Sequence, residues 1–230
     1  MMRTANKITR ANPGGSVQLP MIHDPPPIRL AAFLPRSRAN GPGMRSVLWV
    51  QGCKLRCAGC FNPDFLPLDG GVLHTPSEVA EMVLAITDTA GVTFSGGEPF
   101  VQAYALAEVA RIVREAGKSI LIFTGFEWED LQATQEPAYR FLLAQADTLI
   151  AGPYRSGISS RHPFLASGNQ RLIHLSDRYR DDDFSTSNNQ PVARRTELRI
   201  VPDGNVAITG FPAVVIREAL LKMDDRVIGD

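Results

Sequence analysis

The segment "RSVLWVQGCKLRCAGCFNP", residues 45–63, joins a short apolar run to all three cysteines of the chain. The run Arg45–Gln51 is rich in β-branched and aromatic residues, which predicts a buried strand. The cysteines follow in one loop with the spacing Cys53-x3-Cys57-x2-Cys60. Because thiolates are preferred ligands of soft metals, we expect this strand to deliver a metal-binding loop to one edge of a sheet.

The ligand set of this loop favours an iron–sulfur cluster. Three thiolates on one short loop suit a cubane, whereas a structural zinc ion needs four protein ligands. None of the four histidines lies in the loop at the spacing of a zinc finger. A [4Fe–4S] cluster held by three cysteines keeps one iron open for a substrate. Zinc and three unrelated buried thiols remain alternatives from the spacing alone.

The residues between the cysteines fit the same interpretation. Gly52 and Gly59 allow the backbone to wrap closely around a cluster and to point amides at its sulfurs. Lys54 and Arg56 would lower the pKa of neighbouring thiols. Each of these two charges is equally typical of an ordinary solvated loop.

The rest of the chain predicts alternating strands and helices. Thr75 and Glu78 form a capping box with Pro76 at the first helical position. Apolar residues at helical spacing follow, and continuous apolar runs separate the helices. The expected strands are 91–97, 119–125 and 147–153, and the expected helices are 76–86, 105–116, 127–133 and 137–146. This order predicts an α/β fold with a mainly parallel sheet.

Four regions are expected along the chain. Residues 1–27 end in "HDPPP" and lack an apolar period, which is typical of a flexible tail, and residues 28–175 hold the core. Residues 176–196 are polar and predict a mobile loop. Residues 197–230 predict a hairpin around Asp203-Gly204 and a last helix, both packed on the core.

The composition limits the class of protein. The chain has 230 residues, 44% hydrophobic and 21% charged, as expected for a globular domain. Its formal net charge is zero, so charge gives no reason to expect nucleic acid or an anionic membrane as a partner. No apolar run is long enough to span a bilayer, and the N-terminus lacks the apolar region of a secretory signal. We therefore expect a cytoplasmic protein.

The cysteine spacing resembles the signature of radical SAM enzymes. The wider segments resemble, in the same order, the activating proteins of anaerobic ribonucleotide reductase, which are glycyl-radical activases. The matching segments are "NGPGMRSVLWVQGCKLRCAGCFNPDF", "TFSGGEPFVQ", "FTGFEWEDL" and "SGNQRLI". The resemblance extends from about Ile28 to Ile173 and implies a partial (βα) barrel of the radical SAM type.

The resemblance also implies the cofactors and the residues that bind them. Cys53, Cys57 and Cys60 would hold the [4Fe–4S] cluster, whose open iron chelates S-adenosylmethionine (SAM). The motif Gly96-Gly97-Glu98-Pro99 would contact the methionine amino group of SAM, and Thr124 is a further polar contact. Glycines let backbone approach a ligand, and a carboxylate pairs with an ammonium group. No catalytic side chain is implied beyond the cluster and SAM.

A later segment is implied to face the substrate. Asn169, Gln170 and Arg171 match an Asn-Gln-Arg run of the activases. Two positions depart from the family pattern. Ala151 replaces an aspartate that lies near the SAM carboxylate in related activases, and Leu165-Ala166 replaces Arg-Gly before a serine. Both departures concern the cofactor or substrate side and leave the cysteine motif intact.

The implied activity is reductive cleavage of SAM to a 5′-deoxyadenosyl radical. In an activase this radical removes a hydrogen atom from a glycine of a partner enzyme, and flavodoxin or ferredoxin supplies the electron. All three cysteines are used by one cluster, so no cysteine is left for auxiliary clusters. Two alternatives remain: a stand-alone radical SAM enzyme that acts on a small molecule or peptide, and a non-catalytic metal-binding module.

Overall fold

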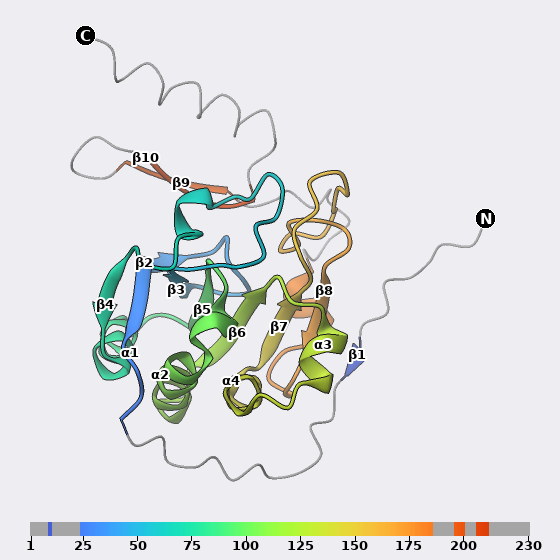
Figure 1. The fold of residues 1–230 in the computed structure, drawn as a ribbon. Coiled ribbons are helices and arrows are strands. Elements are labelled where there is room, and N and C mark those ends of the chain that lie inside the picture. The colour runs from blue at the N-terminus through green and yellow to red at the C-terminus, as the bar shows by residue number, and fades with distance from the viewer. Residues whose placement is uncertain (1–8, 11–23, 186–195, 201–205, 212–230) are drawn as a thin grey trace.

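An eight-stranded sheet forms the centre of the protein (Figure 1). The computed structural model describes residues 9–10, 24–185, 196–200 and 206–211. The sheet has the strand order β1-β8-β7-β6-β5-β3-β2-β4. Its strands are β1 (Thr9–Arg10), β2 (Ile28–Ser37), β3 (Arg45–Val50), β4 (Val72–His74), β5 (Gly91–Gly96), β6 (Ser119–Thr124), β7 (Thr148–Ala151) and β8 (Arg171–His174).

The centre of this sheet is parallel, and the strand pairs that directly border the centre are antiparallel. Strands β3, β5, β6 and β7 are mutually parallel neighbours, while β2 pairs antiparallel with both β3 and β4. Strand β8 pairs antiparallel with β7. The sheet is open, with edges at β1 and β4, and this confirms the expected α/β fold with a mainly parallel sheet. The carboxyl ends of the four parallel strands meet at one edge, where βα folds place ligand groups.

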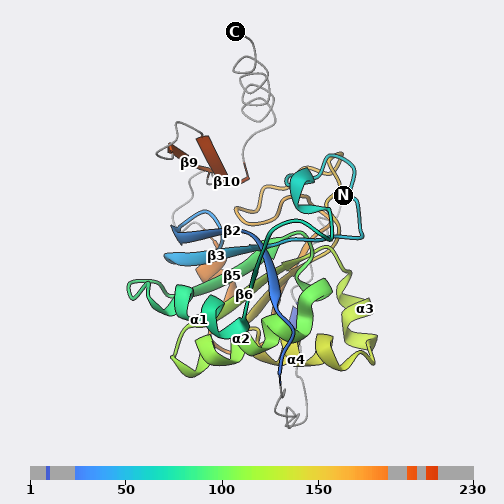
Figure 2. The same cartoon turned by 60° about the vertical axis from the view of Figure 1, so that its left-hand side comes forward.

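One face of the sheet is covered by helices, and we call it the helix face (Figure 2). The helices are α1 (Pro76–Leu84), α2 (Ala103–Glu115), α3 (Trp128–Ala133) and α4 (Pro137–Gln145). The capping box of α1 is confirmed, because Thr75 Oγ1 accepts from Glu78 N and Glu78 Oε2 accepts from Thr75 N. The main hydrophobic core lies on this face between α1, α2, α4 and alternate residues of β3, β5 and β6.

The opposite face of the sheet, which we call the inner face, is covered by loops. A second cluster of buried residues fills it: Leu121, Ile150, Phe164, Leu165, Leu172, Phe184 and Phe211. Phe184 belongs to the short 3₁₀ helix η3 (Asp181–Phe184), and Tyr179 packs against the same cluster. The first part of the polar segment 176–196 is therefore anchored by aromatic side chains, and residues 186–195 lie outside the described residues.

The two ends of the chain are described only in part. Of the tail 1–27, Thr9 and Arg10 pair in parallel with β8, and residues 24–27 lead into β2. The expected hairpin is present as the antiparallel pair β9 (Thr196–Ile200) and β10 (Val206–Gly210). Its turn and the expected last helix lie outside the described residues. Within the described part of the chain, no helix is long and apolar enough to cross a membrane.

A buried guanidinium fastens the amino ends of the central strands. Arg45 is fully buried at the start of β3, and it donates to Thr93 Oγ1 at 2.9 Å and to Ser119 Oγ at 2.9 Å. It also donates to the Tyr179 hydroxyl at 3.0 Å and to Val92 O at 2.7 Å. Burial lowers the pKa of Arg45 from its ordinary value. These bonds join β3, β5, β6 and the segment after β8, at the sheet edge opposite to the cysteine loop.

Candidate iron–sulfur and SAM site

The cysteine loop leaves the carboxyl end of β3 and is closed by backbone hydrogen bonds. Gly52 has a φ of +97°, which an L-residue rarely adopts, and its N–H donates to Phe65 O at 2.8 Å. The N–H of Cys53 donates to Leu66 O at 3.0 Å. Phe65 ends the 3₁₀ helix η1 (Pro63–Phe65), so the three cysteines lie on a loop whose two ends are tied together.

Backbone amides point at two of the three sulfurs. Burial raises the pKa of the Cys53 thiol, and the N–H groups of Leu55 and Arg56 oppose this rise by donating to the sulfur. The N–H of Asn62 donates to Cys60 Sγ at 3.4 Å. Amides directed at cysteine sulfurs are a common feature of iron–sulfur sites and tune the cluster. The loop therefore fits the ligand set of a cluster.

The thiols do not form a site for a single ion. Among the residues that the structure describes, no three His, Cys, Asp or Glu side chains lie close enough together to hold one metal ion. Cys53 is buried, and Cys57 and Cys60 are partly exposed. In a cubane each cysteine binds a different iron, so the ligands need not meet at one point.

The Gly-Gly-Glu-Pro turn is hydrogen-bonded to the cysteine loop. At the end of β5, Gly97 N donates to Val50 O at 2.7 Å and Glu98 N donates to Gly52 O at 2.9 Å. A Cβ atom on Gly97 would lie 2.3 Å from Gly52 O, so this approach requires glycine. The structure thus brings two predicted motifs, distant in sequence, into direct contact.

The Glu98 carboxylate is buried and accepts hydrogen bonds from the neighbouring strand end. Oε1 accepts from Thr124 Oγ1 at 2.8 Å and from Phe100 N at 3.1 Å, and Oε2 accepts from Gly125 N at 2.8 Å. Burial raises the pKa of Glu98 to about 7, and these three donors oppose the rise. Thr124 therefore contacts Glu98, which it orients. Cys53, Cys57, Cys60, Glu98 and Thr124 are called the cluster-side group below.

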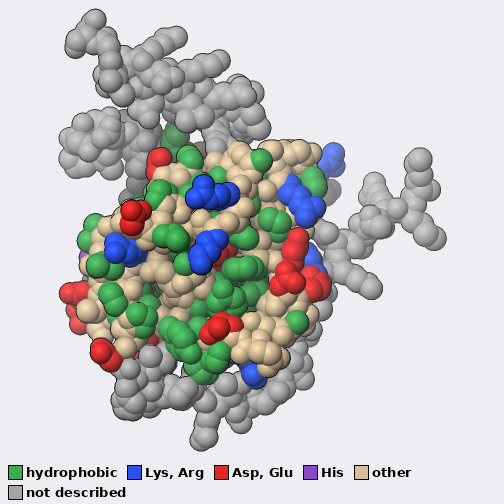
Figure 3. All heavy atoms as spheres, viewed as in Figure 1, with side chains coloured by type: hydrophobic (Ala, Val, Ile, Leu, Met, Phe, Trp, Pro, Cys, Tyr) green, Lys and Arg blue, Asp and Glu red, His purple; other side chains and the backbone are tan. Residues whose placement is uncertain are grey.

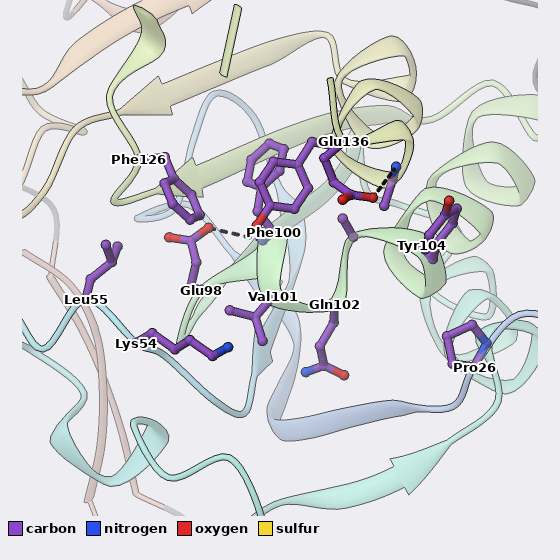
Figure 4. A pocket seen from close by; sticks show the side chains of 13 residues that line it. Pro26, Lys54, Leu55, Glu98, Phe100, Val101, Gln102, Tyr104, Phe126 and Glu136 are labelled. Atoms are coloured by element: carbon purple, nitrogen blue, oxygen red, sulfur yellow. Dashed lines mark hydrogen bonds between the residues drawn. The ribbon is translucent and has the colours of Figure 1, made fainter. Parts of the chain in front are cut away.

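A cavity of about 510 Å³ lies beside Glu98 on the helix face. Figure 4 shows Glu98, Phe126, Leu55 and Lys54 around it, and Figure 3 shows apolar side chains gathered in this hollow with basic side chains at its rim. Leu55 packs on the residue that follows β6. A Cβ atom added to that residue, Gly125, would lie only 2.4 Å from Leu55 Cδ1. The wall of the cavity includes the buried Glu98 carboxylate and the charged side chain of Lys54.

The predicted substrate-side residues lie elsewhere along the same edge, and we call Asn169, Gln170 and Arg171 the β7–β8 group. Asn169 Nδ2 donates to Pro153 O at 2.8 Å, and its Oδ1 is buried with no hydrogen-bond partner within the described structure. Arg171 forms an ion pair with Glu129 of α3. These contacts place the group against α3 and the loop after β7.

Gln170 has a structural role in that group. Its side chain is buried, Oε1 accepts from Ala166 N at 2.8 Å and from Ser167 N at 3.2 Å, and Nε2 donates to Gly152 O at 2.9 Å. These bonds join the loop after β7 to the segment before β8. Both the oxygen and the nitrogen of the Gln170 amide therefore bond to backbone groups.

Both departures from the family pattern are buried apolar residues. Ala151 ends β7 and belongs to the main core on the helix face, where it pairs with Thr124 of β6. Leu165 belongs to the inner-face cluster together with Phe164. An aspartate or arginine at these positions would be buried among apolar side chains, which is costly without a partner.

Sequence reasoning missed Gln102, which supports the cysteine loop. Its Nε2 donates to Gln51 O and to Arg29 O, both at 2.9 Å, and its Oε1 accepts from Arg29 N at 2.7 Å. The side chain thereby connects the Gly-Gly-Glu-Pro turn to β2 and to the residue that leads into the loop. The one indication in the sequence was that Gln102 ends the segment "TFSGGEPFVQ", which resembles the activases.

Comparison with known proteins agrees with this geometry. The profile of a family described as "4Fe-4S single cluster domain" matches residues 39–173. The anaerobic ribonucleoside-triphosphate reductase-activating protein of Salmonella typhi is 34% identical over 159 residues, 64% of this chain and 99% of that protein. The protein of the same name from Enterobacteria phage T4 is 31% identical over 140 residues, 58% of this chain and 85% of that protein.

A shorter match concerns another activating enzyme. The pyruvate formate-lyase-activating enzyme of Clostridium pasteurianum is 39% identical over 83 residues, 34% of this chain and 35% of that enzyme. The resemblance inferred from the motifs is confirmed, and with it the iron–sulfur cluster and SAM as cofactors. The chain belongs to the family of 4Fe-4S single cluster domains, and within it the chain is a radical SAM enzyme related to the reductase-activating proteins.

Proposed function

We propose that this enzyme cleaves SAM reductively at a [4Fe–4S] cluster and uses the 5′-deoxyadenosyl radical to install a glycyl radical on a partner enzyme such as anaerobic ribonucleotide reductase. One observation carries the proposal: the three-cysteine loop is hydrogen-bonded through Gly52 to Glu98 of the Gly-Gly-Glu-Pro turn. Relatives named as activating proteins of that reductase support it.

The proposal gives each residue of the cluster-side group a role. Cys53, Cys57 and Cys60 hold the cluster, which supplies an electron and an open iron for SAM when bound. Gly96, Gly97 and Pro99 shape the turn beside it. Glu98 pairs with the methionine ammonium. Burial raises the pKa of Glu98 to about 7, and a nearby cation would favour the ionised form of this carboxylate. Thr124 holds the carboxylate in place.

Three further parts of the proposal concern the surroundings of the enzyme. Flavodoxin or ferredoxin in the cytoplasm supplies the electron. Arg171 faces the partner enzyme, since its side chain is partly exposed. Asn169 lies beside it, and its Oδ1 is a buried acceptor that a donor of the partner or of SAM would satisfy. Gln170 holds the backbone behind them.

The test uses the chain reconstituted anaerobically with iron and sulfide. Candidate anaerobic reductase is added with SAM and dithionite, and glycyl radical on the reductase is measured by EPR. We expect the doublet of a glycyl radical, and none with the Cys57→Ala variant. Deoxyadenosine without any glycyl radical on candidate reductases would refute the partner and retain the chemistry.

A second candidate is a stand-alone radical SAM enzyme that acts on a small molecule or peptide. The buried apolar residues Ala151 and Leu165 favour it, because both stand where the activases carry polar or flexible residues. It predicts that a small substrate stimulates deoxyadenosine formation in the absence of any reductase. Stimulation by the reductase alone would exclude it.

A further inference from the structure

The cavity beside Glu98 has charges of both signs in its wall. Among the described residues that line it, Lys54 is the only basic one, and it belongs to the cysteine loop. The acidic lining residues are Glu98, after the end of β5, and Glu136, which precedes α4. Figure 4 shows these three side chains around the cavity. The remaining polar side chains of the wall carry no formal charge: Gln102, Tyr104 and Tyr139.

The Lys54 ammonium group is available to a ligand. Its side chain is exposed, and it forms no ion pair with another residue that the structure describes. The donors to the Glu98 carboxylate are one hydroxyl and two backbone amides, so Lys54 is not used there. A cation in a cavity wall without a protein partner can accept an anionic group of the ligand.

The side of the cavity formed by α4 repels a second negative charge. Burial raises the pKa of Tyr139 in α4, and the charges of Glu98 and Glu136 raise it further. Both carboxylates therefore act on this side of the wall. A ligand that places a cation at Glu98 would find its own carboxylate repelled from α4 and attracted to Lys54.

We propose that this cavity receives the α-amino carboxylate end of SAM, with its ammonium group at Glu98 and its carboxylate at Lys54. The inference rests on the proposed function and adds Lys54 as a binding residue that selects ligands with a carboxylate. An α-amino acid carries both charges on one carbon, so a wall with a buried carboxylate and an unpaired lysine complements it. Ala151, at the end of β7, offers no alternative, because it is apolar and 1% exposed.

The position of Lys54 in the chain agrees with this assignment. Lys54 directly follows Cys53, so a carboxylate bound to it lies beside the loop that holds the cluster. Glu98 is tied to the same loop through the bond from its N–H to Gly52 O at 2.9 Å. The two charged groups that would bind SAM are thus attached to the same loop, one on each side of Cys53.

The test measures the equilibrium binding of two ligands to the reconstituted chain by anaerobic isothermal titration calorimetry, without any reductant. SAM carries both charged groups, whereas decarboxylated SAM keeps the ammonium group and has no carboxylate. The variants are Lys54→Met and Glu98→Gln. Arg56→Met is the matched control, because it removes a positive charge from the same loop at an exposed residue that does not line the cavity. Iron and sulfide analysis checks that all variants are loaded equally.

The dissociation constant of decarboxylated SAM divided by that of SAM gives a selectivity ratio for the carboxylate. Lys54→Met is expected to weaken SAM binding by about tenfold, since one charge-assisted hydrogen bond is lost. Decarboxylated SAM should bind to it no more weakly than to the unmodified chain. The ratio should therefore fall by about tenfold in Lys54→Met and stay unchanged in Arg56→Met. Glu98→Gln should weaken both ligands, because both carry the ammonium group.

An unchanged ratio in Lys54→Met, or an equal fall in Arg56→Met, would overturn this inference. Unweakened binding of both ligands to Glu98→Gln would do the same. Deoxyadenosine formed by the unmodified chain with SAM and dithionite would still support the proposed function in each of these cases. An unmodified, iron-loaded chain that neither binds SAM nor forms deoxyadenosine would overturn the proposed function and this inference with it.

Discussion

The cluster-side group and the β7–β8 group lie on the same edge of the sheet, but their side chains are used differently. In the first group the polar contacts join the two predicted motifs: Glu98 connects β5, β6 and the cysteine loop. In the second, Gln170 connects two loops through backbone alone, and Arg171 pairs with α3. The comparison teaches that matching a family motif does not by itself distinguish residues that bind a ligand from residues that support the fold.

The largest expected effect is the loss of the cluster in Cys57→Ala. With one of three thiolate ligands removed, the loop no longer holds the cluster, so iron bound after anaerobic reconstitution should fall to background. Iron and sulfide analysis and the visible absorption band measure this. Far-UV circular dichroism is the control, since Cys57 is outside the hydrophobic cores. Unchanged iron content in a folded variant would remove Cys57 from the ligand set.

The second prediction concerns the pH dependence of stability without SAM. The pKa of Glu98 is about 7 in the folded chain and about 4.5 in the unfolded chain, so its contribution is most favourable below pH 4.5. This stability is lost as the pH rises to 7, by on the order of 3 kcal/mol. Urea denaturation from pH 5 to 8 should show the fall in the unmodified chain and a flatter profile in Glu98→Gln. Parallel profiles would show that Glu98 does not titrate in this range.

The third prediction separates structure from binding in the β7–β8 group. Gln170→Ala removes three hydrogen bonds to buried backbone, and we expect the free energy of unfolding to fall by about 2 kcal/mol. Urea denaturation measures it, with Gln135→Ala at an exposed position as the matched control. A variant as stable as the control would contradict the structural role and return Gln170 to the candidates for substrate contact.

The smallest expected effect on stability is that of Arg171→Ala. Exposed ion pairs contribute about 0–1 kcal/mol, so loss of the Glu129 pair should leave the urea midpoint almost unchanged. If Arg171 contacts the partner enzyme, the yield of glycyl radical should fall while deoxyadenosine formation without partner stays the same. EPR and deoxyadenosine assays on one preparation measure both. Equal glycyl radical yields would remove Arg171 from the partner surface.

The helix face could be predicted from the sequence, and the inner face could not. Apolar residues at helical spacing and continuous apolar strands identified α1, α2, α4 and the central strands, because both patterns are local. The inner face is closed by Phe164, Phe184 and Phe211, which come from three different segments outside the central strands and the α-helices. Nothing local in a polar stretch such as "RYRDDDF" indicates that its last residue is buried.

The same distinction applies to the candidate site. The cysteine spacing and the Gly-Gly-Glu-Pro motif are local, and they predicted the two elements that the structure brings into contact. The bond from Gly125 N to Glu98 depends on the register of β5 against β6, which the sequence does not reveal. The burial of Arg45 depends likewise on acceptors from three separate segments, β5, β6 and the segment after β8.

The central claim is that the three-cysteine loop and the turn at Glu98 together cleave SAM. Its most direct test is the chain reconstituted anaerobically with iron and sulfide, mixed with SAM and dithionite, with deoxyadenosine and methionine measured by mass spectrometry. The account predicts that both products form in equal amounts, and that Cys57→Ala forms neither. A reconstituted, iron-loaded chain that forms no more deoxyadenosine than Cys57→Ala would contradict it.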